Sequence, residues 1–134
     1  MSENQSTPNI ELASMLEFAD YQTTLRQKRE ILRAEFQDAC VFAYNGGLFE
    51  LTSEFLAGLE TRLKYSSKSS LWVLDRNQTA VIIADVPSFI QEATEQYNQA
   101  IENFGKEWNI LRRQRNVQGI IDLPKVAITQ KTYD

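Results

Sequence analysis

The sequence contains no histidine and only one cysteine, and these two absences exclude several kinds of chemistry. Without histidine the chain cannot form a Ser-His-Asp or Cys-His catalytic arrangement, nor a zinc site built on imidazole ligands. One cysteine cannot form an internal disulfide or a four-cysteine zinc site. Paired carboxylates remain, but in helical proteins they hold metal chiefly together with histidine. We therefore expect no enzymatic activity, no cofactor and no metal ion.

Long hydrophobic runs are also missing. The longest apolar stretches, Ala39–Tyr44 and Ala80–Ala84, are far shorter than the roughly 20 residues that a membrane helix needs. The first nine residues are polar and lack the basic-then-apolar order of a signal peptide. These features predict a soluble intracellular protein that does not contact membranes.

The length of 134 residues and the 43% hydrophobic content predict one domain with a real core. We expect a disordered N-terminus over residues 1–9, a single helical domain over residues 10–117 and a C-terminal arm over residues 118–134. The 14 basic residues are outnumbered by 18 acidic ones, which gives a net charge of -4. This balance disfavours general nucleic-acid binding, which usually needs a basic face.

Two long helices are predicted, over Glu11–Tyr44 and Pro87–Arg115. Apolar side chains recur every three or four residues in both, as on the buried face of a helix. In the first helix this stripe consists of Phe18, Tyr21, Leu25, Leu32, Phe36, Ala39 and Ala43, with Lys28 as its polar interruption. Asn45-Gly46-Gly47 reads as a helix end, because glycine past the last turn accepts a positive φ. Asp85 is a candidate cap for the second long helix.

A short helix and a β-hairpin are expected between the long helices. Thr52 or Ser53 can cap a helix of about a dozen residues. The hairpin, at residues 71–84, is predicted from the apolar runs Leu71–Leu74 and Thr79–Ile83, joined by a polar loop. Neither run alternates with polar residues, so both faces of the hairpin need cover.

The predicted fold class is therefore α+β and mostly helical. We expect the two long helices to pair as an antiparallel coiled-coil-like hairpin, with the short helix and the β-hairpin between them. Helices with exposed apolar stripes often complete their core by association, so we expect a homo-oligomer or a larger assembly.

Two sets of residues are candidates for contacts with other molecules. The candidate protein-binding residues lie in the hairpin and the C-terminal arm: Trp72, Leu74, Val81, Ile83, Ile120, Ile121 and Leu123. The candidate nucleic-acid-binding residues are Lys106, Arg112, Arg113 and Arg115, which Arg26, Lys28, Arg29 and Arg33 could join. The second set has a purely structural explanation, because basic residues at the end of a helix complement its dipole.

Two other features have structural interpretations. Cys40 lies among apolar residues with no basic neighbour in sequence, so we interpret it as a small buried hydrophobe. The segment Asp75–Thr79 lacks the glycine and the terminal glutamate of a calcium loop, and we reject that interpretation.

Several strings along the chain carry a resemblance to a known group of proteins. They are Phe42–Phe49, Leu74-Asp75, Ile82–Asp85 leading into Phe89-Ile90, Tyr97, Trp108 and Leu111–Val117. Together they resemble small structural and assembly proteins of contractile-tailed bacteriophages of the cyanophage type. The resemblance implies a virion component or assembly factor, located in the cytoplasm of a host cell or in the virion. It transfers no functional residue.

The sequence thus favours a non-enzymatic protein–protein interaction module. Two alternatives stay open. One is a nucleic-acid-associated factor that uses the cluster of Arg112, Arg113 and Arg115. The other is a phage protein that binds and modulates a host protein.

Overall fold

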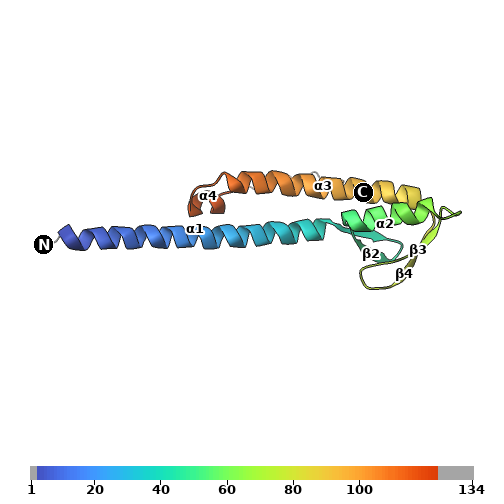
Figure 1. Cartoon of the computed structure of the whole chain (residues 1–134), viewed down its shortest axis with the longest axis horizontal. Coiled ribbons are helices and arrows are strands. Elements are labelled where there is room, and N and C mark those ends of the chain that lie inside the picture. Colours follow the sequence, from blue (N-terminus) through green and yellow to red (C-terminus); the bar gives the residue numbers. More distant parts are fainter. Residues whose placement is uncertain (1–2, 124–134) are drawn as a thin grey trace. The chain divides into compact units, whose positions relative to one another are not determined.

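The computed structural model describes residues 3–123, and the side chains of residues 11–123. The chain divides into two compact units: the core unit, Ala34–Phe104, and the helical unit, which combines residues 1–33 with residues 105–134. Figure 1 labels the elements. In chain order they are α1 (Glu3–Ala39), β1 (Val41–Tyr44), β2 (Gly47–Glu50), α2 (Ser53–Lys64), β3 (Leu71–Leu74), β4 (Ala80–Ile83), α3 (Val86–Arg112) and α4 (Val117–Ile121).

The first helix ends five residues earlier than expected, and the segment that follows it is a β-hairpin. Strands β1 and β2 pair antiparallel, with Tyr44 opposite Gly47. Asn45 and Gly46, with φ values of 46° and 82°, form the two-residue turn between them. Positive φ at both positions defines the hairpin turn for which Asn-Gly is the preferred sequence. The prediction that Asn45-Gly46-Gly47 caps a helix was therefore wrong.

The predicted second hairpin is confirmed. Strand β3 pairs antiparallel with β4, in a register that places Trp72 opposite Ile82 and Leu74 opposite Ala80. Side chains alternate between the two faces of a strand, so these four residues share one face. The opposite face carries Val73, Val81 and Ile83, which are all buried.

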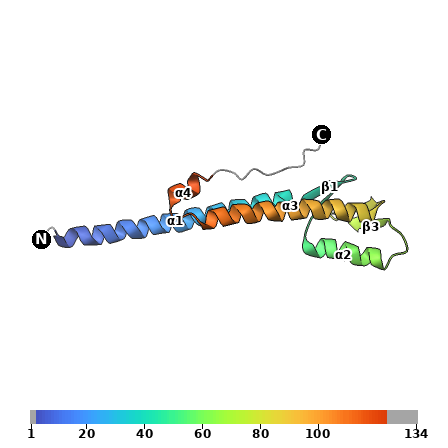
Figure 2. The same ribbon diagram turned by 90° about the horizontal axis from the view of Figure 1, so that it is seen from above.

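The aromatic ring of Phe89, in the first turn of α3, is the centre of the core unit. Rings from both β1 and β2 meet it edge-on: Phe42 at 5.2 Å, Tyr44 at 5.1 Å and Phe49 at 5.3 Å between centroids. Phe55 of α2 adds a fourth ring at 6.4 Å. Both views show α2 beside the first turns of α3 (Figures 1 and 2). Hydrophobic burial around one large ring thus joins the first hairpin to both helices.

The helix boundaries in the core unit have local causes. The Thr52 side chain accepts a hydrogen bond from the N–H of Phe55 and so caps α2, as predicted. Asp85 caps α3 by accepting from the N–H of Ser88. At the end of α1, the side-chain amide of Gln96 donates to the carbonyls of Ala39 and Val41, at 2.9 Å each. Gln96 belongs to α3, so a partner distant in sequence satisfies carbonyls that the end of α1 leaves unpaired.

Helices α1 and α3 pack together within each unit. In the core unit the ring of Phe36 lies 5.0 Å from that of Phe104, between centroids. In the helical unit the hydroxyl of Tyr21 donates to the carbonyl of Gln114, and Trp108 lies against Arg29. Tyr21 contacts Gln114, whereas Arg29, which comes later in the chain, contacts the earlier residue Trp108. The two segments of the helical unit therefore run antiparallel.

The remaining differences concern the ends of helices. Helix α1 begins at Glu3, inside the segment expected to be disordered. The expectation failed because a polar segment without apolar periodicity can be either coil or solvated helix. Helix α3 ends at Arg112, three residues early, and the short helix α4 begins after an Asn116 cap. Residues 1–2, and the arm from residue 124 on, lie outside the described part of the chain.

Candidate protein interaction surface

The outward face of the β3–β4 hairpin exposes large apolar side chains. Trp72 is 62% exposed and Leu74 is 55% exposed. Their cross-strand neighbours Ile82 and Ala80 complete a surface that we name the hairpin ridge. Large exposed aromatic and aliphatic groups on one rigid face are typical of protein contact sites.

Hydrogen bonds fix both strands of the ridge to the rest of the core unit, at the cross-strand pair Trp72 and Ile82. The guanidinium of Arg62, on α2, donates to the carbonyl of Trp72 at 2.8 Å. The side-chain amide of Asn45, in the first hairpin turn, donates to the carbonyl of Ile82 at 3.2 Å. The ridge is therefore anchored at β3 and at β4, and is already ordered before any partner arrives.

Asp75 joins the two hairpins. One carboxylate oxygen accepts from the N–H of Leu48 in β2 at 3.0 Å, and the other accepts from the N–H groups of Asn77 and Thr79 at 2.9 Å. The hydrogen bond from Leu48 is the main reason that the pKa of Asp75 lies below its usual value. The other two hydrogen bonds and the nearby Arg76 act in the same direction, and burial acts against them. This carboxylate therefore organises the β3–β4 loop through backbone donors.

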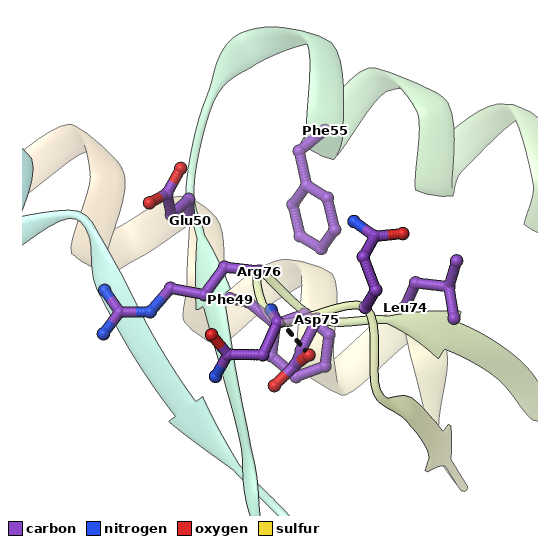
Figure 3. A pocket seen from close by; sticks show the side chains of 8 residues that line it. Phe49, Glu50, Phe55, Leu74, Asp75 and Arg76 are labelled. Carbon is purple, nitrogen blue, oxygen red and sulfur yellow. Dashed lines mark hydrogen bonds between the residues drawn. The ribbon is translucent and has the colours of Figure 1, made fainter.

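An open hollow of about 550 Å³ lies beside the ridge (Figure 3). Its lining combines the aromatic side chains of Phe49 and Phe55 with polar groups of the β3–β4 loop. The complete set is Phe49, Glu50, Phe55, Leu74, Asp75, Arg76, Asn77 and Gln78. Leu74 belongs to both features, so the hollow extends the ridge into a larger surface of mixed character.

The positive charges of the core unit lie close to this surface in sequence. All four of its basic residues lie between positions 62 and 76, whereas its ten acidic residues are spread along residues 34–104. The four are Arg62, Lys64, Lys68 and Arg76. Tyr65 stands among them with 81% of its surface exposed, and the ammonium of Lys64 lies 5.7 Å from its ring centroid. Arg62 donates to the ridge and Arg76 lines the hollow together with Glu50, so the apolar surface has basic residues at its margin.

Three of the predicted protein-binding residues are unavailable for contacts. Val81 is buried, Ile83 is 0% exposed, and Ile120 is buried in the helical unit. The prediction was wrong for these three. For Val81 and Ile83 the reason is that both strand faces are apolar and the sequence does not reveal which face packs inward, whereas Ile120 is the buried residue of the short helix α4. Trp72, Leu74 and Ile121 are exposed and Leu123 is half-buried, so these four remain accessible.

The predicted nucleic-acid-binding residues all fall in the helical unit, together with the basic residues of α1. The guanidinium carbons of Arg29 and Arg33 each lie 5.3 Å from the centroid of the Trp108 ring. The structure therefore brings the basic stretch of α1 to α3. All four candidates are exposed, and the guanidinium of Arg112 donates to the side-chain oxygen of Asn109, three residues earlier.

Sequence analysis missed a second apolar surface. Phe18 was expected in a buried stripe but is 63% exposed, because no other described segment packs beside it. Leu12, Met15 and Leu16 in the same stretch of α1 are also exposed. Their spacing of three and four residues was a signal that could have identified one apolar helix face.

The interpretation of Cys40 as a small buried hydrophobe agrees with its environment. The residue is buried in the core unit, and burial raises the pKa of its thiol to about 11. The thiol is therefore protonated and poorly nucleophilic at neutral pH. Among residues 3–123, no three histidine, cysteine or acidic side chains gather closely enough to hold a metal ion. No helix within these residues is long and apolar enough to cross a membrane.

Comparisons with known proteins add no relative. No protein-family model matches the chain, and neither a curated protein sequence nor a solved structure is significantly similar to it.

Proposed function

We propose that this protein is a non-enzymatic protein–protein interaction module that acts as a structural component or assembly factor of a phage virion. The hairpin ridge is the observation that carries the interaction role. Trp72 and Leu74 are exposed on strands whose other face is anchored in the core. Aromatic anchors on an ordered scaffold contribute much of the binding energy in protein interfaces.

The virion role and the location in a host cytoplasm or a virion rest on the sequence resemblance described above. The proposal also includes coiled-coil-like packing between α1 and α3, which the contacts of Phe36 and Trp108 support. Ile121 and Leu123 of the C-terminal arm are a second set of proposed contacts, because both retain accessible surface.

The ridge is tested by replacing Trp72 and Leu74 together with serine and capturing partners from native lysate with the full-length protein. The wild type should retain a partner, or further copies of itself, that the double variant loses. Ile101→Ser is the matched control, because Ile101 is also exposed but lies on α3, away from the ridge in sequence. Identical sets of captured proteins for all three forms would contradict the proposal.

A nucleic-acid-associated function is the second candidate, and the environment of Trp108 favours it. Two guanidinium groups and an indole ring lie together there, and both kinds of group are common in single-strand binding sites. A salt titration of DNA and RNA binding tests this candidate, because contacts with phosphates weaken steeply as salt rises. Absence of binding at about 50 mM salt would remove it.

A further inference from the structure

The N-terminal part of α1 displays an apolar surface that no other segment among residues 3–123 covers. Every residue from Glu11 to Asp20 is exposed. Leu12, Met15, Leu16 and Ala19 follow the spacing of one helix face, and Met15 is 67% exposed. We name these four residues the N-terminal apolar face. Helices that dock on another protein are anchored by residues with this spacing.

The sequence segments that carry the two exposed apolar surfaces differ in the sign of their charge. Residues 11–20 contain Glu11, Glu17 and Asp20 and no basic residue. The segment around the hairpin ridge, residues 62–76, contains four basic residues and one acidic residue. That acidic residue is Asp75, whose carboxylate already accepts three backbone hydrogen bonds. One chain therefore carries an acidic apolar helix face and a basic aromatic strand face.

We infer that the N-terminal apolar face of one copy docks on the hairpin ridge of a second copy. The inference rests on the proposed function and deepens it by naming the partner as another molecule of the same chain. Apolar burial contributes affinity, and the opposite charges of the two margins favour this pairing over others. A parallel pairing of two N-terminal faces would instead place Glu11, Glu17 and Asp20 of one copy opposite the same residues of the other, and these like charges would repel.

Docking of two different surfaces has a consequence for assembly. In a pair joined by one such contact, the first copy retains its free ridge and the second retains its free helix face. Such head-to-tail contacts produce rings where the rotation closes and open filaments where it does not. Either product is consistent with a structural or assembly role.

Charge reversal in the full-length protein tests the pairing. The helix variant is Glu17→Lys with Asp20→Lys, and the ridge variant is Lys64→Glu with Lys68→Glu. Sedimentation velocity over a range of concentrations should show self-association of the wild type, weakened by salt. Each variant alone should associate roughly tenfold or more weakly, because one of its two margins now repels the other. An equal mixture of both variants should recover association, since each restores the opposite charges that the other lacks.

Other outcomes overturn the inference in distinguishable ways. Asp38→Lys with Glu92→Lys is the matched control, and it should associate as the wild type does. If the helix variant associates normally while the Trp72→Ser and Leu74→Ser variant does not, the ridge binds a different surface and only the inference fails. If the wild type remains monomeric at every concentration, the partner is not a second copy. If the serine variant also keeps every captured partner, the proposed function fails as well.

Discussion

The core unit and the helical unit use their large side chains in different ways. In the core unit four aromatic rings surround Phe89, and the thirteen residues of the buried cluster come from both hairpins, from helices α2 and α3, and from the segments next to the first hairpin. In the helical unit, α1 exposes large apolar side chains such as Met15 and Phe18, and the Trp108 ring lies against two arginines of α1. The difference indicates that the core unit supplies most of the buried packing, whereas both units display contact surface: the hairpin ridge in one and the exposed apolar side chains of α1 in the other.

The charges divide in the same way. The core unit contains ten acidic and four basic residues, whereas the helical unit contains eight acidic and ten basic residues. The overall charge of -4 therefore conceals two units of opposite sign. Each unit also contains one of the two tryptophans, Trp72 or Trp108, so fluorescence of single-tryptophan variants can report on each unit separately.

The largest expected effect is the loss of the central ring of the core unit. Phe89→Ala should lower the free energy of unfolding by about 3–5 kcal/mol, because it leaves a cavity among four rings. Phe18→Ala, on the exposed part of α1, should change it by less than about 0.5 kcal/mol. Urea denaturation of both variants measures the contrast. Equal costs would show that the two units do not differ in the way described.

The next largest effect on stability concerns the carboxylate of Asp75, which joins the two hairpins. Because folding lowers the pKa of Asp75, its ionised form stabilises the fold above the unfolded value of about 3.9. That stability is lost as the pH falls through the lower folded pKa. Asp75→Asn should therefore destabilise the core unit at neutral pH and reduce its loss of stability below about pH 4. Denaturation monitored at Trp72 at several pH values measures this, and an unchanged acid transition would contradict the assignment.

Two glycine substitutions compare how tightly the units are packed. A Cβ added at Gly47 would lie 2.7 Å from a methyl carbon of Val81, whereas one added at Gly105 meets nothing within 4 Å. Gly47→Ala should therefore cost about 1–3 kcal/mol through overpacking. Gly105→Ala should stabilise α3 by up to about 1 kcal/mol, since alanine is the better helix former. Thermal melts of both variants measure the two signs, and a destabilising Gly105→Ala would show that the helical unit is packed there as tightly as the core.

The smallest predicted effect tests a single hydrogen bond of the helical unit. The Tyr21 hydroxyl donates to the carbonyl of Gln114 at 3.0 Å. Tyr21→Phe should cost about 0.5–1.5 kcal/mol, detected by Trp108 and not by Trp72. Tyr65→Phe is the control, since Tyr65 is exposed and belongs to the core unit. An equal response of both tryptophans would mean that the units unfold together.

Several elements could be predicted from the sequence because their signals are local. The β3–β4 hairpin follows from two apolar runs around a polar loop, and the starts of α2 and α3 follow from Thr52 and Asp85. The β1–β2 hairpin was missed because Asn45-Gly46 is compatible both with a helix end and with a hairpin turn. The pairing of Val41–Tyr44 with the next segment, Gly47–Glu50, and the amide of Gln96 decide between the two, and the partner at Gln96 is distant in sequence.

The candidate site was predictable only in part, because the sequence shows which faces are apolar but not which of them another segment covers. The sequence identified the β3–β4 hairpin as too apolar on both faces, which led to Trp72 and Leu74. It also selected Val81 and Ile83, which are buried. The exposed face of α1 at Leu12 and Met15 was missed, because periodicity predicts that a helix has an apolar face but not whether another segment covers it.

The amino-acid sequence by itself determined the absence of histidine-based chemistry, the turn and cap residues, and the helical or strand preference of most segments. These properties depend on a residue and its near neighbours, so they are present before the chain folds. The tertiary structure alone decided which face of β3–β4 packs inward, where α1 ends and which apolar side chains remain exposed. Those outcomes depend on contacts such as Phe42 with Phe89 and Leu48 with Asp75, which join segments more than 25 residues apart.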